Sequence, residues 1–201
     1  MGGWAMRRTT RGEVLRAATA GGAAIGAGAL VADWVEPSAS VGRPSASQDA
    51  RIWRFLLLLE QAQAALYDSA LHSRALSPQL VEYVRVVAAH EHDHVALIRR
   101  RLGSQARSAP AFDYRDATSS DARFQRTAID LEEAALAAYI AEGANLTTGS
   151  VADAARIVAV DARHAAWIRD IAGAEPAPRA ADPGRSPEDL IAELRKKGLL
   201  P

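Results

Sequence analysis

The feature that most constrains this chain is a duplicated pair, an acid followed three positions later by a histidine, inside two alanine-rich stretches. One stretch reads VVAAHEHDHVALIRR and contains Glu91 and His94. The other reads IVAVDARHAAWIRD and contains Asp161 and His164. The two pairs are separated by the same number of residues, because 161−91 and 164−94 both equal 70. Side chains three residues apart lie on one face of a helix. The spacing therefore predicts two related helices, each with an acid and an imidazole on one face.

A second repeat adds one more acid to each half of the chain. The segments LEQAQAALY and LEEAALAAY place Glu60 and Glu132 at an offset of 72 residues, since 132−60 equals 72. A four-helix bundle that holds two metal ions takes one carboxylate from each of two helices and a Glu-x-x-His pair from each of the other two. The order of these four segments predicts such a bundle, and hence an all-α fold.

Turn and capping signals place the ends of the helices. Ser77-Pro78 and Gly103 bound the second helix, and Ser150 with Asp153 forms a capping-box-like start to the fourth. The long connection over residues 103–118 is typical of a crossover between helices two and three. The expected helices cover residues 49–73, 78–102, 119–143 and 150–173, with a short C-terminal helix over 186–197.

The domain organisation follows from these boundaries and from the composition of the ends. The expected parts are an export signal and linker over residues 1–47, the bundle over 48–173, and a Pro/Ala linker with the C-terminal helix over 174–201. A chain of 201 residues suits one domain with appendages. The C-terminal helix is expected to pack on the bundle or on a partner.

Charge and cysteine content exclude several functions. Lys+Arg and Asp+Glu both number 24, so the chain has no general basic field that would attract nucleic acid. It has no cysteine, which excludes disulfides, thiolate zinc sites and iron–sulfur clusters. Any metal must be held by oxygen and imidazole nitrogen.

The N-terminal segment resembles a twin-arginine export signal. Arg7-Arg8 precedes a Gly/Ala-rich apolar stretch and a Pro/Ser-rich linker with small residues near Ser40 and Ser47 that suit cleavage. The alternative is an ordinary amphipathic helix. A permanent membrane helix is less favoured, because the apolar stretch is barely long enough and contains Asp33. We expect an extracytoplasmic protein, membrane-associated only if the signal stays uncleaved.

The bundle resembles the ferritin-like superfamily, specifically the exported bacterial ferritin-like domain proteins related to desiccation-associated proteins. The resemblance rests on LEQAQAALY, AAHEHDHVALIR, the Phe112-Asp113-Tyr114 link, LEEAALAAY and VAVDARHAAWIR. It implies two-metal ligands at Glu60, Glu91, His94, Glu132, Asp161 and His164. Two positions depart from the family pattern: Asp161 replaces a glutamate and is one methylene shorter, and Gln63 stands where a second helix-one acid is common.

Charge supports a metal independently of the family. Four ionised carboxylates in one alanine-rich core would each cost several kcal/mol to desolvate and would repel one another, whereas two divalent cations neutralise them. Oxygen and imidazole ligands suit iron or manganese, and ligand type alone also admits zinc. We expect two divalent ions, with iron first and manganese second. The resemblance implies redox activity toward O₂, peroxide or ferrous iron, of a ferroxidase, peroxidase or catalase-like kind.

Other residues near the acids are not expected to be ligands. Tyr67 and Tyr139 lie two turns from the acids, about 10 Å along the axis, and should fill the core or hydrogen-bond at its end. His90 and His92 lie off the inward face and should be exposed, with His90 the candidate for supporting a ligand. No catalytic residue is assigned.

Two other functions fit the sequence. If the acids are protonated or face solvent, the protein is a non-catalytic helical bundle, an envelope or stress-protective protein with a degenerate metal site. A ferritin-type storage cage ranks lower, because an export signal and a long linker fit poorly with a cytoplasmic shell. The sequence identifies no protein partner, and a homodimer is compatible with it.

Overall fold

The computed structural model describes residues 43–201, and all regular structure within that range is helical. The helices are α2 (Ala46–Leu71), α3 (Pro78–Leu102), α4 (Asp121–Glu142), α5 (Thr148–Ile171) and α6 (Pro187–Lys196). The expected all-α bundle with a short C-terminal helix is confirmed. The proposed signal with Arg7-Arg8 lies outside the described residues. Among the described helices, none combines the length and apolarity needed to cross a membrane.

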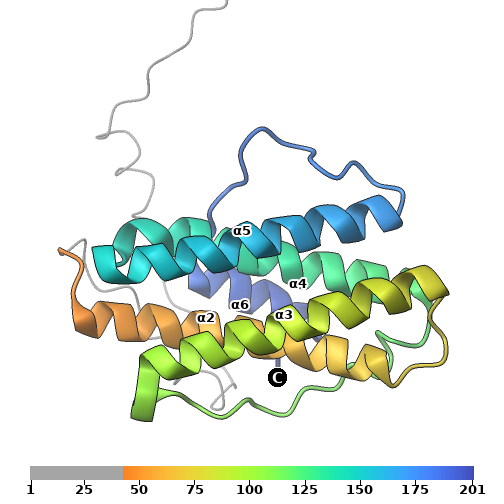
Figure 1. Ribbon diagram of the computed structural model, residues 1–201, viewed down its shortest axis with the longest axis horizontal. Coiled ribbons are helices and arrows are strands. Elements are labelled where there is room, and N and C mark those ends of the chain that lie inside the picture. Colours follow the sequence, from red (N-terminus) through yellow and green to blue (C-terminus); the bar gives the residue numbers. More distant parts are fainter. Residues whose placement is uncertain (1–42) are drawn as a thin grey trace, which may run out of the picture.

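Two helical hairpins make the bundle. α2 packs on α3 and α4 packs on α5, while α2–α4 and α3–α5 contacts join the hairpins (Figure 1). The connection between α3 and α4 runs along the outside of the first hairpin, as a crossover does (Figure 1). The two halves of the repeated sequence therefore face each other, so equivalent helices of the repeat lie side by side in the bundle.

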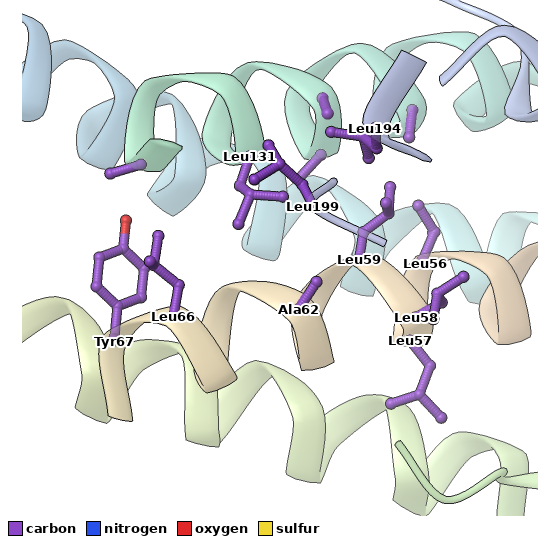
Figure 2. Close-up of a cluster of buried hydrophobic side chains, with 14 of the residues drawn as sticks. Leu56, Leu57, Leu58, Leu59, Ala62, Leu66, Tyr67, Leu131, Leu194 and Leu199 are labelled. Carbon is purple, nitrogen blue, oxygen red and sulfur yellow. The ribbon is translucent and has the colours of Figure 1, made fainter. Parts of the chain in front are cut away.

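The middle of α2 is buried around its whole circumference. Residues 56–59 are four consecutive leucines, each exposed by no more than 1%. Consecutive helical residues point about 100° apart, so neighbours must cover the whole circumference. α3 and α4 pack against it. Leu194 and Leu199 of the C-terminal tail belong to the same buried cluster as Leu59 and Leu131 (Figure 2).

The C-terminal tail is fixed to the bundle by backbone contacts as well as by leucines. A Cβ on Gly184 would lie 2.9 Å from the backbone nitrogen of Ala141, so only glycine permits this close approach. The next residue, Arg185, donates its N–H to the carbonyl of Ala137 at 3.1 Å. Tyr114 in the crossover donates to the carbonyl of Leu199 at 2.8 Å. The tail thus packs on its own bundle.

The start of α5 differs from the expected capping box. α5 begins at Thr148, and the N-cap is Thr147. The N–H of Thr147 donates to the carboxylate of Asp49 at 2.9 Å, and the Ser150 hydroxyl donates to the same carboxylate. Ser150 also accepts from the indole of Trp53 at 3.2 Å. Ser150 therefore joins α5 to α2, and an acid on the neighbouring helix accepts the N–H of the N-cap residue.

Candidate metal centre

The six predicted side chains meet at one point inside the bundle. Glu60 comes from α2 and Glu132 from α4, while α3 and α5 each supply one acid and one histidine. All four carboxylate residues are 0% exposed, and the two histidines are 7% and 3% exposed. Periodicity explains this convergence, since each acid interrupts an otherwise apolar inward face. The alternative in which the acids face solvent is wrong.

The six residues form two overlapping groups of candidate ligands. One group is Glu60, Glu91, His94 and Asp161, and the other is Glu91, Glu132, Asp161 and His164. Within each group, one donor atom from every residue lies within 4.8 Å of the others. Glu91 and Asp161 belong to both groups, which is the arrangement that carboxylates bridging two cations require.

The contacts of the first imidazole define one half of the centre. The Nδ1 of His94 lies 3.3 Å from an oxygen of Glu60, 3.5 Å from Oε2 of Glu91 and 3.3 Å from Oδ1 of Asp161. In the other half, the Nδ1 of His164 lies 3.0 Å from Oε1 of Glu91 and 3.7 Å from an oxygen of Glu132. Glu91 therefore presents a different oxygen to each imidazole.

In the part of the chain that the structure describes, these buried ligand atoms have no hydrogen-bond partners. Eight such atoms belong to the centre: Oε2 of Glu60, both carboxylate oxygens of Glu91, Nδ1 of His94, Oε2 of Glu132, both carboxylate oxygens of Asp161 and Nδ1 of His164. Buried polar atoms are nearly always paired, because each unpaired one costs the desolvation of that group. A cluster of eight unpaired oxygen and nitrogen atoms around one point fits metal ions, since cations would serve as partners for all of them.

Tyrosines hold the two acids that belong to one group only. Tyr139 donates to Oε1 of Glu60 at 2.7 Å, and Tyr67 donates to Oε1 of Glu132. Each of these acids therefore keeps one free oxygen, whereas Glu91 keeps two. The tyrosines do not lie at an end of the core, as distance along a single helix suggested, because each reaches across to the acid of the opposite half.

Burial and mutual repulsion oppose the ionisation of all four carboxyl groups at once. Burial raises the pKa of Glu91 to about 8, and burial together with the charge of Glu91 raises the pKa of Glu132 to about 8. Burial and the neighbouring carboxylates raise the pKa of Asp161 well above its usual range. Burial also acts to raise the pKa of Glu60, but contact with His94 outweighs it and the pKa is lowered. Protons therefore occupy part of the centre when no cation does.

The two histidines differ electrostatically. Burial acts to lower the pKa of His94, but its contacts with Glu60 and Glu91 outweigh burial and raise it to about 10. Burial is the dominant effect on His164, whose pKa is lowered. A neutral His164 has one nitrogen lone pair and one N–H, so its two nitrogens have different roles.

The neighbouring histidines are exposed, as expected, but only one contacts the centre. His92 faces away and lies 2.9 Å from a carboxylate oxygen of Asp68. His90 places its Nδ1 2.9 Å from the Nε2 of His164. Gln63 on α2 is fully buried, and neither its amide oxygen nor its amide nitrogen has a hydrogen-bond partner among residues 43–201. The sequence did not predict that this amide would be buried, and marked Gln63 only as a departure from the family pattern.

The fold and the centre together define a class of protein: a helical bundle whose four helices direct carboxylates and imidazoles to one buried point that could hold metal ions. A family model for the ferritin-like domain matches residues 48–174, well over half of the chain. The chain therefore belongs to the ferritin-like domain family. No curated protein matches it at a significant level. The superfamily predicted from the sequence is confirmed, while the exported, desiccation-related type stays a prediction.

Proposed function

We propose that this protein binds two divalent metal ions, iron first and manganese second, and is redox-active toward O₂, peroxide or ferrous iron. The observation that carries the proposal is the set of eight unpaired buried donor atoms, which divides into two groups of one nitrogen and three oxygens. Four carboxylates and two divalent cations form a neutral cluster, which removes the cost of burying the acids.

The residues of the chain would each have a distinct part in this centre. Glu60 with His94 would hold one ion, Glu132 with His164 would hold the other, and the two shared acids would bridge them. Bound iron or manganese would supply a redox couple that the side chains lack. Tyr139 and Tyr67 would orient the terminal acids by donating to the oxygen that faces away from the ion.

Proton release accompanies metal binding in this proposal. Glu91 and Glu132 carry protons at neutral pH because burial raises the pKa of each to about 8. Only the ionised carboxylates bind cations well, so these protons must leave when the ions enter. The buried, alanine-rich surroundings exclude bulk water and so preserve the electrostatic attraction between the acids and the ions.

Elemental analysis tests the proposal. Protein purified without added metal is expected to contain close to two equivalents of iron or manganese, and His94→Ala is expected to lose metal. His92→Ala is the matched control, because His92 lies on the same helix but is exposed and contacts Asp68 instead. After ferrous iron and air are added, ferric absorption in the ultraviolet–visible spectrum should develop faster with the wild type and His92→Ala than with His94→Ala or with buffer alone.

A metal-free protein that takes up no iron or manganese would overturn the proposal. If that protein were also as stable as the His94→Ala variant, the alternative of a non-catalytic bundle with a degenerate centre would be favoured. The stabilities of the wild type and the variant must be compared in the full chain at one ionic strength, because exposed ion pairs weaken with salt.

We also propose that the protein is exported, as a member of the desiccation-related type. The support is the sequence around Arg7-Arg8 followed by the apolar stretch and the Pro/Ser-rich linker. A twin-arginine route would suit a metal protein, because it carries folded chains that have already acquired their ions. Replacing Arg7-Arg8 by Lys-Lys should retain the protein in the cytoplasmic fraction. Unchanged fractionation would refute this route.

A further inference from the structure

We propose that the two metal positions are unequal and that His90 makes the position beside His164 the tighter one. This inference rests on the proposed function, because it assumes that ions bind at the centre. It goes beyond that proposal by assigning a positioning residue and an order of filling. The evidence is a pair of contacts that one half of the centre has and the other half lacks.

The first contact is between two imidazoles. The Nδ1 of His90 lies 2.9 Å from the Nε2 of His164, and the two rings are nearly parallel, 11° apart. The other nitrogen of His164, Nδ1, faces the carboxylate of Glu91 at 3.0 Å. When the Nδ1 lone pair binds an ion, the proton of the ring must lie on Nε2. His90 then accepts that N–H, which fixes both the tautomer and the orientation of the ligand ring.

The other half of the centre has no equivalent contact. Within residues 43–201, the Nε2 of His94 makes no hydrogen bond, although its Nδ1 faces three carboxylate oxygens. The repeat explains the difference. His90 lies four residues before His94, and the corresponding residue four positions before His164 is Val160, since 160−90 equals 70. The repeat position that carries an imidazole on α3 therefore carries an apolar side chain on α5.

The second contact lies in the same half. The hydroxyl of Tyr83 is 2.9 Å from that of Tyr67, which donates to Glu132. The Tyr83 ring also contacts Trp167 edge to face, with centroids 5.1 Å apart. The corresponding residue of the other half is Asp153, since 153−83 equals 70, and it pairs with Arg101 on the surface instead. Both additional supports therefore belong to the ion position formed by Glu132 and His164.

The carboxylate ligands of the two halves have matched support. Each terminal acid has one tyrosine donor, and the two bridging acids are shared. A hydrogen bond to the far nitrogen of a ligand histidine typically changes metal affinity by about 10–100-fold. The position beside His164 is therefore expected to bind the first ion, and the position beside His94 the second, with affinities that differ by at least about tenfold.

Calorimetric titration of the metal-free full chain with Mn²⁺ tests the inference. The wild type is expected to show two binding events separated by at least about tenfold in affinity, and His90→Val should weaken the tighter event by about 10–100-fold while leaving the other unchanged. His90→Gln should recover part of the loss, because the amide oxygen can accept the N–H of His164. His90 is exposed, so neither change removes a core side chain.

Two further variants sharpen the result. Val160→His restores a ring nitrogen at the repeat position of His90, and it is expected to strengthen the weaker event. His92→Val, on the same helix as His90, is the control and should change neither event. In crystals grown with one equivalent of Mn²⁺, anomalous scattering should lie beside His164 rather than His94.

The possible failures are distinct. Two ions that bind with equal affinity in the wild type, or a His90→Val variant with unchanged affinities, would overturn this inference and leave the proposed function standing. Anomalous scattering beside His94 at one equivalent would overturn it as well. A wild-type protein that binds no Mn²⁺ and no ferrous iron would overturn the proposed function, and this inference with it.

Discussion

Glu91→Gln is expected to have opposite effects on the metal-free and metal-bound protein. Glu91 is fully buried, and its two oxygens face different imidazoles. Glutamine keeps the size and shape of glutamate but cannot ionise. The substitution should therefore stabilise the metal-free bundle, because it removes a carboxyl that burial disfavours, and it should weaken both metal positions, because it removes a bridging ligand.

The magnitude follows from the pKa of Glu91, which burial raises from 4.5 to about 8. In the folded protein at pH 7 this carboxyl is mainly protonated, whereas in the unfolded chain it is ionised. Protonating a carboxyl of pKa 4.5 at pH 7 costs about 3.4 kcal/mol, since each pH unit corresponds to about 1.36 kcal/mol. Glutamine avoids this cost but loses the favourable contact with His94, so we expect a net gain of about 2–3 kcal/mol.

Thermal unfolding followed by circular dichroism measures this gain. For a chain of this size, about 2–4 °C per kcal/mol gives an increase of about 4–12 °C in the Tm of the metal-free protein. Glu82→Gln is the matched control on the same helix. Glu82 is exposed and forms an ion pair with Arg85 on the surface, so its replacement should leave both Tm and metal content unchanged. A metal-free Glu91→Gln protein that melts below the wild type, or one that keeps both ions, would refute the reasoning.

Three further predictions concern the same centre and the tail. Between pH 6.5 and 8 the Tm of the metal-free protein should fall as pH rises. The folded state raises the pKa values of Glu91, Glu132 and His94, so it binds more protons than the unfolded chain does in this range. Saturating Mn²⁺ should reverse the trend in the same pH series of Tm values. Tyr139→Phe should remove the hydrogen bond to one terminal acid and lower the affinity of the position beside His94 by about 10-fold or more, with the other position unchanged, as calorimetry with Mn²⁺ would show. Leu194→Ala should destabilise the bundle by about 2–4 kcal/mol, since this α6 side chain is 2% exposed, and a denaturation midpoint within error of the wild type would contradict the packing of the tail.

The helices and the inward faces could be predicted from local pattern. Apolar residues at helical spacing identify one face of each helix, and an acid on that face must be buried wherever the face packs. The repeat offsets then identify which acids are equivalent. This reasoning is sufficient for the six residues of the centre, because each ligand lies on the inward face of its own helix, whichever neighbour that face meets.

The capping of α5 shows where local pattern fails. Ser150 and Asp153 have the spacing of a capping box, yet Asp49 from another helix accepts the N–H of Thr147 and the hydroxyl of Ser150. These partners are separated by 98 and 101 positions in the chain. A local motif competes with any polar group that packing brings nearby, and sequence spacing gives no information about that group.

The sequence by itself determined the all-helical fold, the inward direction of four acids and two histidines, and the equivalence of its two halves, because helical periodicity and repeat spacing are properties of a single chain segment. Only the tertiary structure decided that Tyr67 reaches Glu132, that Tyr139 reaches Glu60 and that His90 contacts His164 in particular. These contacts cross between helices, and they depend on the rotation and separation of packed helices. Periodicity specifies the face that a helix buries, whereas packing specifies the atoms that this face meets.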